Sequence, residues 1–384
     1  MMPATVLAPK QAGDTLAVRF IAEGDQSAAD IASQMAEFIS LANDQLDLAA
    51  YDCRLDEDAA RPIRDALRDR LKSGVTVRLI YDDSFKKPQS HSEFESIGGD
   101  FAEGGTHERV QELGLPAELI RGIQGEGLMH QKFMVRDQQA VWTGSMNWTN
   151  DSMTRMENTI VSAISPELAA LYERDFEQLW NTRQTLESGK FATSPVQLQY
   201  AGKAVSTDVD FSPGQGEHIN EWVAKKVLRA RARIVFCSML INSSKLLEAL
   251  MTVLDQQKLE LWGVYDKTQM DGVLHQWNSN PHVTWKVEAV QRLLREAEMI
   301  GKHSLPYRPG HSHNFMHNKL LVVDDVVITG SYNLSHSAQA NAENMLAIES
   351  PELAADAIAY IEMLRNRFLV DPRKAEASPT GRTG

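Results

Sequence analysis

The sequence predicts an α/β chain built from two similar halves, each with a mixed β-sheet flanked by helices. Strand-length apolar segments alternate with longer segments whose apolar residues recur at helical spacing, which favours layers of strands and helices. Residues 130–147 read HQKFMVRDQQAVWTGSMN, and residues 317–333 read HNKLLVVDDVVITGSYN. Because the order of elements around the first stretch recurs around the second, we expect a tandem repeat with pseudo-two-fold symmetry.

The first half is expected to span residues 15–183, after a loose tail at residues 1–14. Apolar and β-branched residues predict strands at Leu16–Ile21, Leu46–Tyr51, Val75–Tyr81, Glu118–Ile123 and Thr159–Ile164. Helical spacing predicts helices at Ser27–Asn43, Ala59–Lys72, Thr106–Leu113 and Pro166–Trp180. Ser27 and Ser165 are suited to cap two of them. Residues 84–106 match no pattern, and we interpret them as a surface loop at the rim of a site.

The polar residues 184–206 are interpreted as an irregular linker, and residues 207–370 as the second half. Strands are predicted at Val209–Phe211, Arg233–Leu240, Leu259–Tyr265, His282–Val287 and Met345–Glu349. Helices are predicted at Glu217–Ala230, Ser244–Gln256, Thr268–Trp277 and after Ser350. A polar stretch at 289–310 precedes the second motif, and residues 371–384 are expected to form a flexible tail.

The composition is that of a globular protein, with 43% hydrophobic and 24% charged residues among 384. The chain begins without a secretory signal pattern and contains no apolar run of about 20 residues, so a cytoplasmic location is the default expectation. Its two cysteines, Cys53 and Cys237, are expected to be buried free thiols. The net charge of −13 argues against tight non-specific binding to duplex nucleic acid or strong adsorption to anionic lipid.

Each of the two similar stretches is predicted to fold as a strand, a tight turn and a second strand. Side chains alternate between faces along a strand, so the His and Lys of each H-x-K, two positions apart, share one face. The Asp that follows the His by seven positions would point the other way. We therefore interpret Asp137 and Asp324 as groups that support the reacting residues from behind or stabilise the turn.

Two such His–Lys pairs facing each other would suit phosphoryl chemistry. A lysine ammonium binds phosphate oxygens, and histidine transfers protons near neutral pH. One imidazole would act as a nucleophile and the other as a general acid, while Ser and Asn of the G-S-x-N tails add neutral donors. Because the two lysines offset the charge of a phosphodiester, no metal or other cofactor is required. His311, His313 and His317 match a loose zinc spacing, but we favour a role for the first two, together with Arg308, in lining the cleft beside the leaving group.

The paired H-x-K-x4-D…G-S-x-N segments resemble the HKD motifs of the phospholipase D superfamily. The resemblance includes an acidic residue beyond each motif, Glu157 in RMEN and Glu343 in NAEN. It implies two similar phospholipase D-like domains with the active site at their interface. It also implies that one histidine becomes a covalent phosphohistidine, and that the other protonates the leaving alcohol and then activates water. The downstream glutamates would each orient an imidazole.

Carried over to this chain, the resemblance implies that His130 is the nucleophile and His317 the general acid and base, although the reverse order stays open. Residues expected to hold the phosphate are Lys132, Lys319, Asn147 and Asn333, with Ser145 and Ser331 as supporting donors. Glu157 and Glu343 would be the orienting carboxylates.

The expected function is hydrolysis of phospholipid headgroup phosphodiesters, with transfer to another alcohol as a variant of the same chemistry. The alternatives are a metal-independent endonuclease acting on DNA or RNA and an inactive phosphate-binding scaffold. The acidic net charge favours the lipid substrate, whereas the lack of an evident membrane-binding helix argues mildly against it. Peripheral membrane contact is compatible with the lipid reading, and no obligate protein partner is evident.

Overall fold

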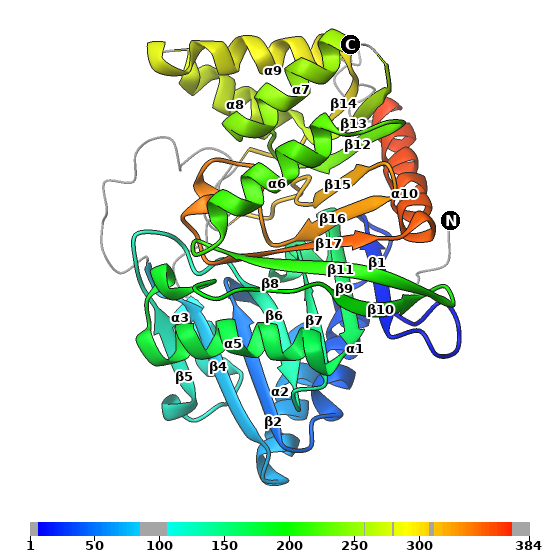
Figure 1. Cartoon of the computed structure of the whole chain (residues 1–384). Helices are drawn as coiled ribbons and strands as arrows, with labels where there is room; N and C mark the ends of the chain where they lie inside the picture. The colour runs from blue at the N-terminus through cyan, green and yellow to red at the C-terminus, as the bar shows by residue number, and fades with distance from the viewer. Residues whose placement is uncertain (1–6, 85–105, 257, 279, 307–310, 371–384) are drawn as a thin grey trace, which may run out of the picture.

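A computed structural model of the chain describes residues 7–84, 106–256, 258–278, 280–306 and 311–370. The first half of the chain forms one β-sheet and the second half forms another (Figure 1). Residues 1–6, nearly all of the expected loop at 84–106 and the expected tail at 371–384 lie outside the described residues. Within the described ranges, no helix is long and apolar enough to span a membrane.

The first sheet has seven strands in the order β1-β9-β7-β6-β2-β4-β5. The strands β2, β4 and β5 run parallel and the other neighbours are antiparallel, so the sheet is mixed, as predicted. In chain order the strands are Leu16–Ile21 (β1), Gln45–Ala50 (β2), Thr76–Asp82 (β4), Ile120–Ile123 (β5), Lys132–Arg136 (β6), Ala140–Gly144 (β7) and Asn158–Ile164 (β9). A short two-stranded sheet joins β3 (Cys53–Arg54) to β8 (Trp148–Thr149).

Helices cover both faces of this sheet. The helices α1 (Ala28–Ser40) and α2 (Glu57–Lys72) pack on one face, and α5 (Pro166–Thr182) packs on the other. Alternation along β6 explains the two layers, because Met134 packs with the core under α1 and α2 while its two neighbours pack with α5. The short helices are α3 (Thr106–Glu112), α4 (Asn150–Thr154), η2 (Ala117–Leu119) and η3 (Thr185–Glu187).

The second sheet has eight strands in the order β10-β11-β17-β16-β15-β12-β13-β14. Without the edge strand β10, this order reproduces the first sheet strand for strand, which confirms the tandem repeat. The strands are Val196–Tyr200 (β10), Lys203–Ser212 (β11), Arg233–Ser238 (β12), Glu260–Asp266 (β13), Glu298–Lys302 (β14), Lys319–Val323 (β15), Val326–Gly330 (β16) and Glu343–Glu349 (β17). The helices are Gly216–Leu228 (α6), Ser244–Gln256 (α7), Lys267–Trp277 (α8), Pro281–Val283 (η4), Thr284–Glu296 (α9), Ser337–Gln339 (η5) and Pro351–Leu369 (α10).

One hydrophobic core joins the two halves. The inner faces of both sheets, together with α5 and α10, belong to a single cluster of buried side chains, while α1 and α2 on one side and α6 and α7 on the other cover separate outer cores. Phe211 of β11, for example, packs edge-on against Tyr172 of α5 with ring centroids 5.1 Å apart. The halves therefore meet through a packed apolar interior, which fixes the motif strands of one half against those of the other.

Two segments differ from the sequence-based expectation. Residues 184–206, interpreted as an irregular linker, contain β10 and the beginning of β11. These strands form a hairpin whose turn, Ala201-Gly202, has positive φ at both residues. An alanine at the first of these positions is not a typical hairpin signal. The backbone N–H groups of both turn residues donate to the carboxylate of Asp14, a partner far away in sequence.

The second difference is at 282–287, predicted as a strand and found as η4 followed by the start of α9. Val287, Val290 and Leu293 are buried and recur every three residues, which is a helical pattern. The polar stretch expected at 289–310 likewise contains most of α9 and the strand β14.

Candidate active site

The two motifs place His130 and His317 just before the central strands β6 and β15. In each half the motif lysine begins the strand, so Lys132 and Lys319 occupy matching positions. All four side chains are at least 98% buried. Each ammonium donates to the carbonyl oxygen of its own motif histidine, over 2.6 Å from Lys132 and 2.8 Å from Lys319. These bonds hold each lysine beside its imidazole, as charged groups in a protein interior require.

In each half, a buried aspartate binds the backbone of the residue that precedes the motif histidine. Asp82 ends β4 and accepts a hydrogen bond of 2.7 Å from the N–H of Met129, the residue before His130. Asp266 ends β13 and does the same for Met316 over 2.9 Å. Burial raises the pKa of Asp82 to about 6, against the opposing effect of its hydrogen-bond donors. A Tyr-Asp pair closes the same strand in both halves, and this repeat is a sequence signal from which the two aspartates could have been recognised.

His130 is held by a carboxylate from the other half of the chain. Its Nδ1 lies 2.5 Å from Oε2 of Glu343, and both side chains are buried. The backbone N–H of His130 also donates to the carbonyl oxygen of Ala342 over 2.9 Å. Because a carboxylate can only accept, Nδ1 is the donor and the in-plane lone pair lies on Nε2. This tautomer leaves on Nε2 the lone pair that a nucleophile or a general base needs.

His317 is held across the same interface by an amide. Its Nδ1 lies 2.8 Å from Oδ1 of Asn158, at the start of β9. The Asn158 Nδ2 donates to the carbonyl oxygen of Ser152 over 3.0 Å, which fixes the amide so that its oxygen faces the ring. Nδ1 of His317 is therefore also a donor, and Nε2 lies 3.2 Å from Nζ of Lys319.

Glu157, expected to orient an imidazole, is paired instead with a lysine that the sequence analysis did not single out. Its Oε2 lies 2.7 Å from Nζ of Lys302, the last residue of β14, and neither side chain is exposed. Burial raises the pKa of Glu157, and the ammonium of Lys302 acts in the opposite direction. The matching glutamates of the two halves thus have different partners, and only Glu343 contacts a motif histidine.

The serines of the G-S-x-N tails are fully buried and bind protein groups. Ser145 Oγ donates to Asn158 Oδ1 over 2.8 Å and accepts from the N–H of Thr159. Ser331 Oγ accepts from the N–H of Asn344 over 2.9 Å. Both hydroxyls therefore support the residues that follow each motif.

The two tail asparagines differ in exposure. Asn147 is 7% exposed, and its Oδ1 finds no hydrogen-bond partner among the described residues, whereas Asn333 is partly exposed. The Asn147 backbone N–H donates to Ser152 Oγ over 3.0 Å. An unsatisfied buried acceptor is costly, and a ligand donor such as an alcohol or water hydroxyl would relieve that cost.

Asp137 and Asp324 lie at the far ends of β6 and β15 from the histidines. Both have a φ of 52°, and each carboxylate accepts from three consecutive backbone N–H groups, at 43–45 for Asp137 and at 231–233 for Asp324. Their contacts are those of turn-stabilising groups, one of the two roles considered for them.

The middle residue of each H-x-K also binds across the interface, which the sequence analysis did not anticipate. Gln131 Oε1 accepts from Asn344 Nδ2 over 2.6 Å, and Asn318 Oδ1 accepts from Thr159 Oγ1 over 2.9 Å. An amide residue at this position in both copies is the sequence signal that could have indicated this.

Metal-ligating side chains do not cluster in the described part of the chain, where no group of three or more His, Cys, Asp or Glu is arranged to hold an ion. His313 lies beside Asp151, with 3.9 Å between Nδ1 and Oδ2, and stacks on Phe315. Arg308, expected to line the cleft with His311 and His313, lies outside the described residues.

Comparison with known families matches both halves of the chain. A family model described as "Cardiolipin synthase, PLD-like domain" covers residues 35–180 and 223–365, and each matched segment contains one copy of the motif. This match covers well over half of the chain.

Curated relatives and solved structures are more distant. The mitochondrial cardiolipin hydrolase of Chlamydomonas reinhardtii is 24% identical over 149 residues, which is 39% of this chain and 57% of that protein. The Xenopus tropicalis protein of the same name is 39% identical over 108 residues, or 28% of this chain and 43% of that one. The chain thus matches about half the length of these relatives. A phosphatidylserine synthase structure from Haemophilus influenzae has a TM-score of 0.61 at 15% identity over 91% of this chain and 86% of its own, a likeness of fold.

Proposed function

Because the chain belongs to the PLD-like domain family of the phospholipase D superfamily, we propose that it cleaves phospholipid headgroup phosphodiesters through a phosphohistidine. One observation carries this proposal: each motif histidine is anchored through Nδ1 by a residue of the opposite half, His130 by Glu343 and His317 by Asn158. Anchoring at Nδ1 presents both Nε2 atoms for chemistry, and anchoring across the interface brings both histidines to it.

In the first step, Nε2 of His130 attacks phosphorus and the bond from phosphorus to the leaving alcohol breaks. His317, protonated on Nε2, gives its proton to the departing oxygen. Lys132, Lys319 and the amides of the two tail asparagines would stabilise charge on the non-bridging oxygens. With two ammonium groups beside the phosphate, we propose that the reaction needs no metal ion.

In the second step, His317 takes a proton from water, and the water oxygen attacks phosphorus. The phosphorus–nitrogen bond breaks, and His130 recovers its lone pair. If an alcohol takes the place of water, the same step transfers the phosphatidyl group instead of hydrolysing it. Hydrolysis and transfer therefore need the same residues and differ only in which acceptor reaches the intermediate.

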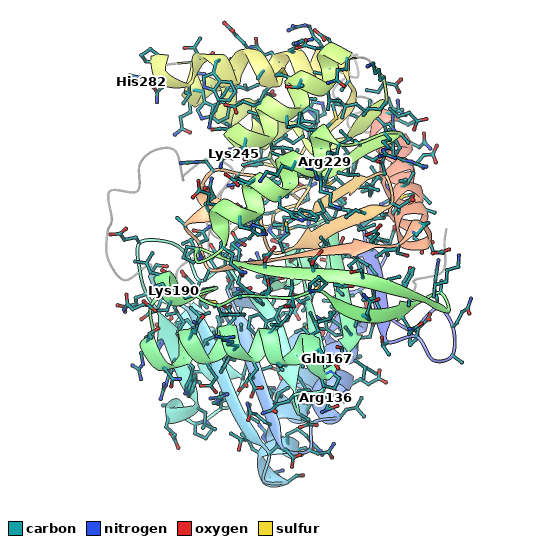
Figure 2. The ribbon with its side chains drawn as sticks, in the orientation of Figure 1. Arg136, Glu167, Lys190, Arg229, Lys245 and His282 are labelled. Atoms are coloured by element: carbon teal, nitrogen blue, oxygen red, sulfur yellow. The ribbon has the colours of Figure 1, made fainter. Side chains whose placement is uncertain are left out.

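The choice of a lipid substrate is supported by the family description and by the names of the curated relatives, all of which concern cardiolipin. The overall charge of −13 also disfavours a polyanionic polymer as substrate. The basic side chains labelled in Figure 2 are spread along the molecule, from Arg136 in the first half to Arg229 and Lys245 in the second. A nuclease activity is the outcome against which the proposal must be tested.

The test compares purified protein with His130→Ala and His317→Ala, in EDTA, on cardiolipin and phosphatidylcholine vesicles and on single- and double-stranded nucleic acids. His282→Ala is a matched control, because His282 is exposed near the start of α9 (Figure 2). We expect the parent and the control to release phosphatidic acid or a headgroup, and the two motif variants to release none. Cleaved polynucleotide without lipid products would replace the lipid assignment with a nuclease, and equal products from all four proteins would refute the site.

A further inference from the structure

The buried residue opposite the strand-ending aspartate is different in the two halves. In the first sheet, β4 pairs with β5 so that Asp82 lies opposite Ile123. In the second sheet, β13 pairs with β14 in the same way, and Asp266 lies opposite Lys302. Both Ile123 and Lys302 are fully buried. A lysine ammonium thus stands in the second half at the place where the first half has an aliphatic side chain.

Lys302 is paired with a carboxylate from the other half of the chain. Its Nζ lies 2.7 Å from Oε2 of Glu157 and 3.1 Å from Oε2 of Glu23, and it donates to the carbonyl oxygen of Arg155 over 3.4 Å. Glu157 precedes β9 as directly as Glu343 begins β17, so the two glutamates are counterparts. Glu343 holds the imidazole of His130, whereas Glu157 holds Lys302.

The asparagines that follow the two glutamates, Asn158 and Asn344, also have different hydrogen-bond partners. Asn158 uses its Oδ1 to accept from Nδ1 of His317. Its counterpart Asn344 uses Oδ1 to accept from the hydroxyl of Tyr172 over 3.0 Å and from Thr143 Oγ1. An amide oxygen keeps His317 in the same tautomer as His130 but adds no negative charge beside the ring.

We propose that Lys302 is a positioning residue that gives the two motif histidines different tasks. By binding Glu157, Lys302 keeps that carboxylate from His317, which retains an amide partner and gives up its Nε2 proton readily. His130 retains a carboxylate partner that stabilises positive charge on the ring as its nitrogen bonds to phosphorus. The assignment of tasks rests on the proposed function, but the effect of Lys302 on His317 is independent of any substrate.

The charged groups connected to His317 among the described residues give the expected direction of this effect. Lys319 lies on the same strand, and Asp266 accepts from the residue before His317. Glu157, bound to Lys302, directly precedes Asn158, whose amide oxygen accepts from His317. Lys302→Ile, which copies Ile123, leaves the carboxylate of Glu157 without its cation, so the imidazolium of His317 gains stability. Glu157→Gln removes one negative charge and leaves the ammonium of Lys302 with Glu23 as its remaining carboxylate partner, so the imidazolium of His317 loses stability.

The test follows the titration of His317 by NMR in histidine-labelled protein, with the signal assigned by its loss in His317→Asn. We expect the titration midpoint to rise by about one pH unit in Lys302→Ile and to fall in Glu157→Gln. Lys302→Arg should keep the parent value, and Lys302→Ile/Glu157→Gln should return close to it. If Lys302→Ile does not fold, the titration midpoint of His317 in Glu157→Gln is the deciding measurement, and the proposal requires it to fall. A midpoint that stays unchanged, or that moves the same way in both single variants, overturns the proposal.

A second readout separates this proposal from the proposed function. Each protein is allowed to react with a phospholipid substrate, and the reaction is then quenched. Mass spectrometry should find the phosphoryl adduct on His130 alone in the parent, and on both histidines in Lys302→Ile. If the titration midpoint of His317 moves in opposite directions in Lys302→Ile and Glu157→Gln but the parent forms no adduct, the role of Lys302 as a positioning residue stands and the proposed function is refuted. An active parent with unshifted variants would refute the role of Lys302 alone.

Discussion

Nδ1 of His130 lies 2.5 Å from Oε2 of Glu343, a residue 213 positions later in the chain that begins a strand of the other sheet. The contact is buried on both sides, and it lies beside a hydrophobic core that both sheets share. Each half alone therefore contains only part of the candidate site. The first half supplies the imidazole and the second half supplies the charge that orients it.

Glu343→Gln should lower kcat on the order of 100-fold while leaving KM for vesicles nearly unchanged. The amide keeps an oxygen for Nδ1, but it lacks the negative charge that stabilises the ring as Nε2 bonds to phosphorus. The measurement is steady-state phospholipid cleavage. Glu349→Gln, at the exposed end of the same strand β17, is the matched control and should behave like the parent. A parental kcat in Glu343→Gln would contradict the role of the carboxylate.

Gly330→Ala should lower the free energy of unfolding by about 3 kcal/mol. Gly330 begins the second G-S-x-N with a φ of 130°, and a Cβ there would lie 2.4 Å from the carbonyl oxygen of Asn344. Gly74→Ala provides the control, because Gly74 also has a positive φ of 87° but a Cβ there meets nothing within 4 Å. Urea unfolding of both variants measures the difference. Equal losses would mean that the close approach of β16 and β17 does not require glycine.

The sequence predicted the motif strands and the tandem order, because each of these appears twice along the chain. When a pattern occurs twice, the interpretation of each copy supports that of the other. Asp82 and Asp266 could have been found in the same way, since each ends its strand after a tyrosine. Their role as acceptors for the N–H groups of Met129 and Met316 is visible only in the hydrogen bonds of the folded chain.

The features that the sequence did not reveal are those at which the two halves differ. Lys302 falls within the stretch at 289–310 that was interpreted only as polar, and its partner Glu157 lies 145 positions earlier. The pairing follows from the register of β14 on β13, which is set by tertiary packing and not by local pattern. Among the described residues, the strand β10 has no counterpart in the first sheet, so the repeat offered no second copy from which to recognise it.

Neither cysteine should react with a thiol reagent in the native protein at pH 8, and both should react in urea. Cys53 and Cys237 are free and buried. Burial raises the pKa of Cys53 to about 12, and burial also raises that of Cys237 well above its ordinary value, so thiolate is scarce at both. Dithionitrobenzoate absorbance measures the reaction. Rapid release of one equivalent from the folded protein would show that one of these cores opens to solvent.

Asp175 should make the protein less stable as the pH rises from about 4 to about 7. Burial raises the pKa of this carboxyl to about 7, even though Ser188, Gly189 and Gln131 all donate to it. The folded state therefore holds this proton more tightly than the unfolded chain, whose carboxyl titrates near 3.8. The stabilisation is fully present below the unfolded pKa and is lost as the pH rises through the folded pKa.

Asp175→Asn should flatten the dependence of stability on pH in that window. Urea unfolding at pH 4, 5, 6, 7 and 8 measures the free energy of each protein, and Asp271→Asn, on the exposed side of α8 beside Lys267, should keep the parent profile. The asparagine cannot ionise, so the difference between parent and variant should change steadily between pH 4 and 7 and then level off. If the difference in free energy of unfolding between parent and Asp175→Asn stays constant across the series, Asp175 has the same pKa in the folded and unfolded chain. Burial then does not raise the pKa of this carboxyl.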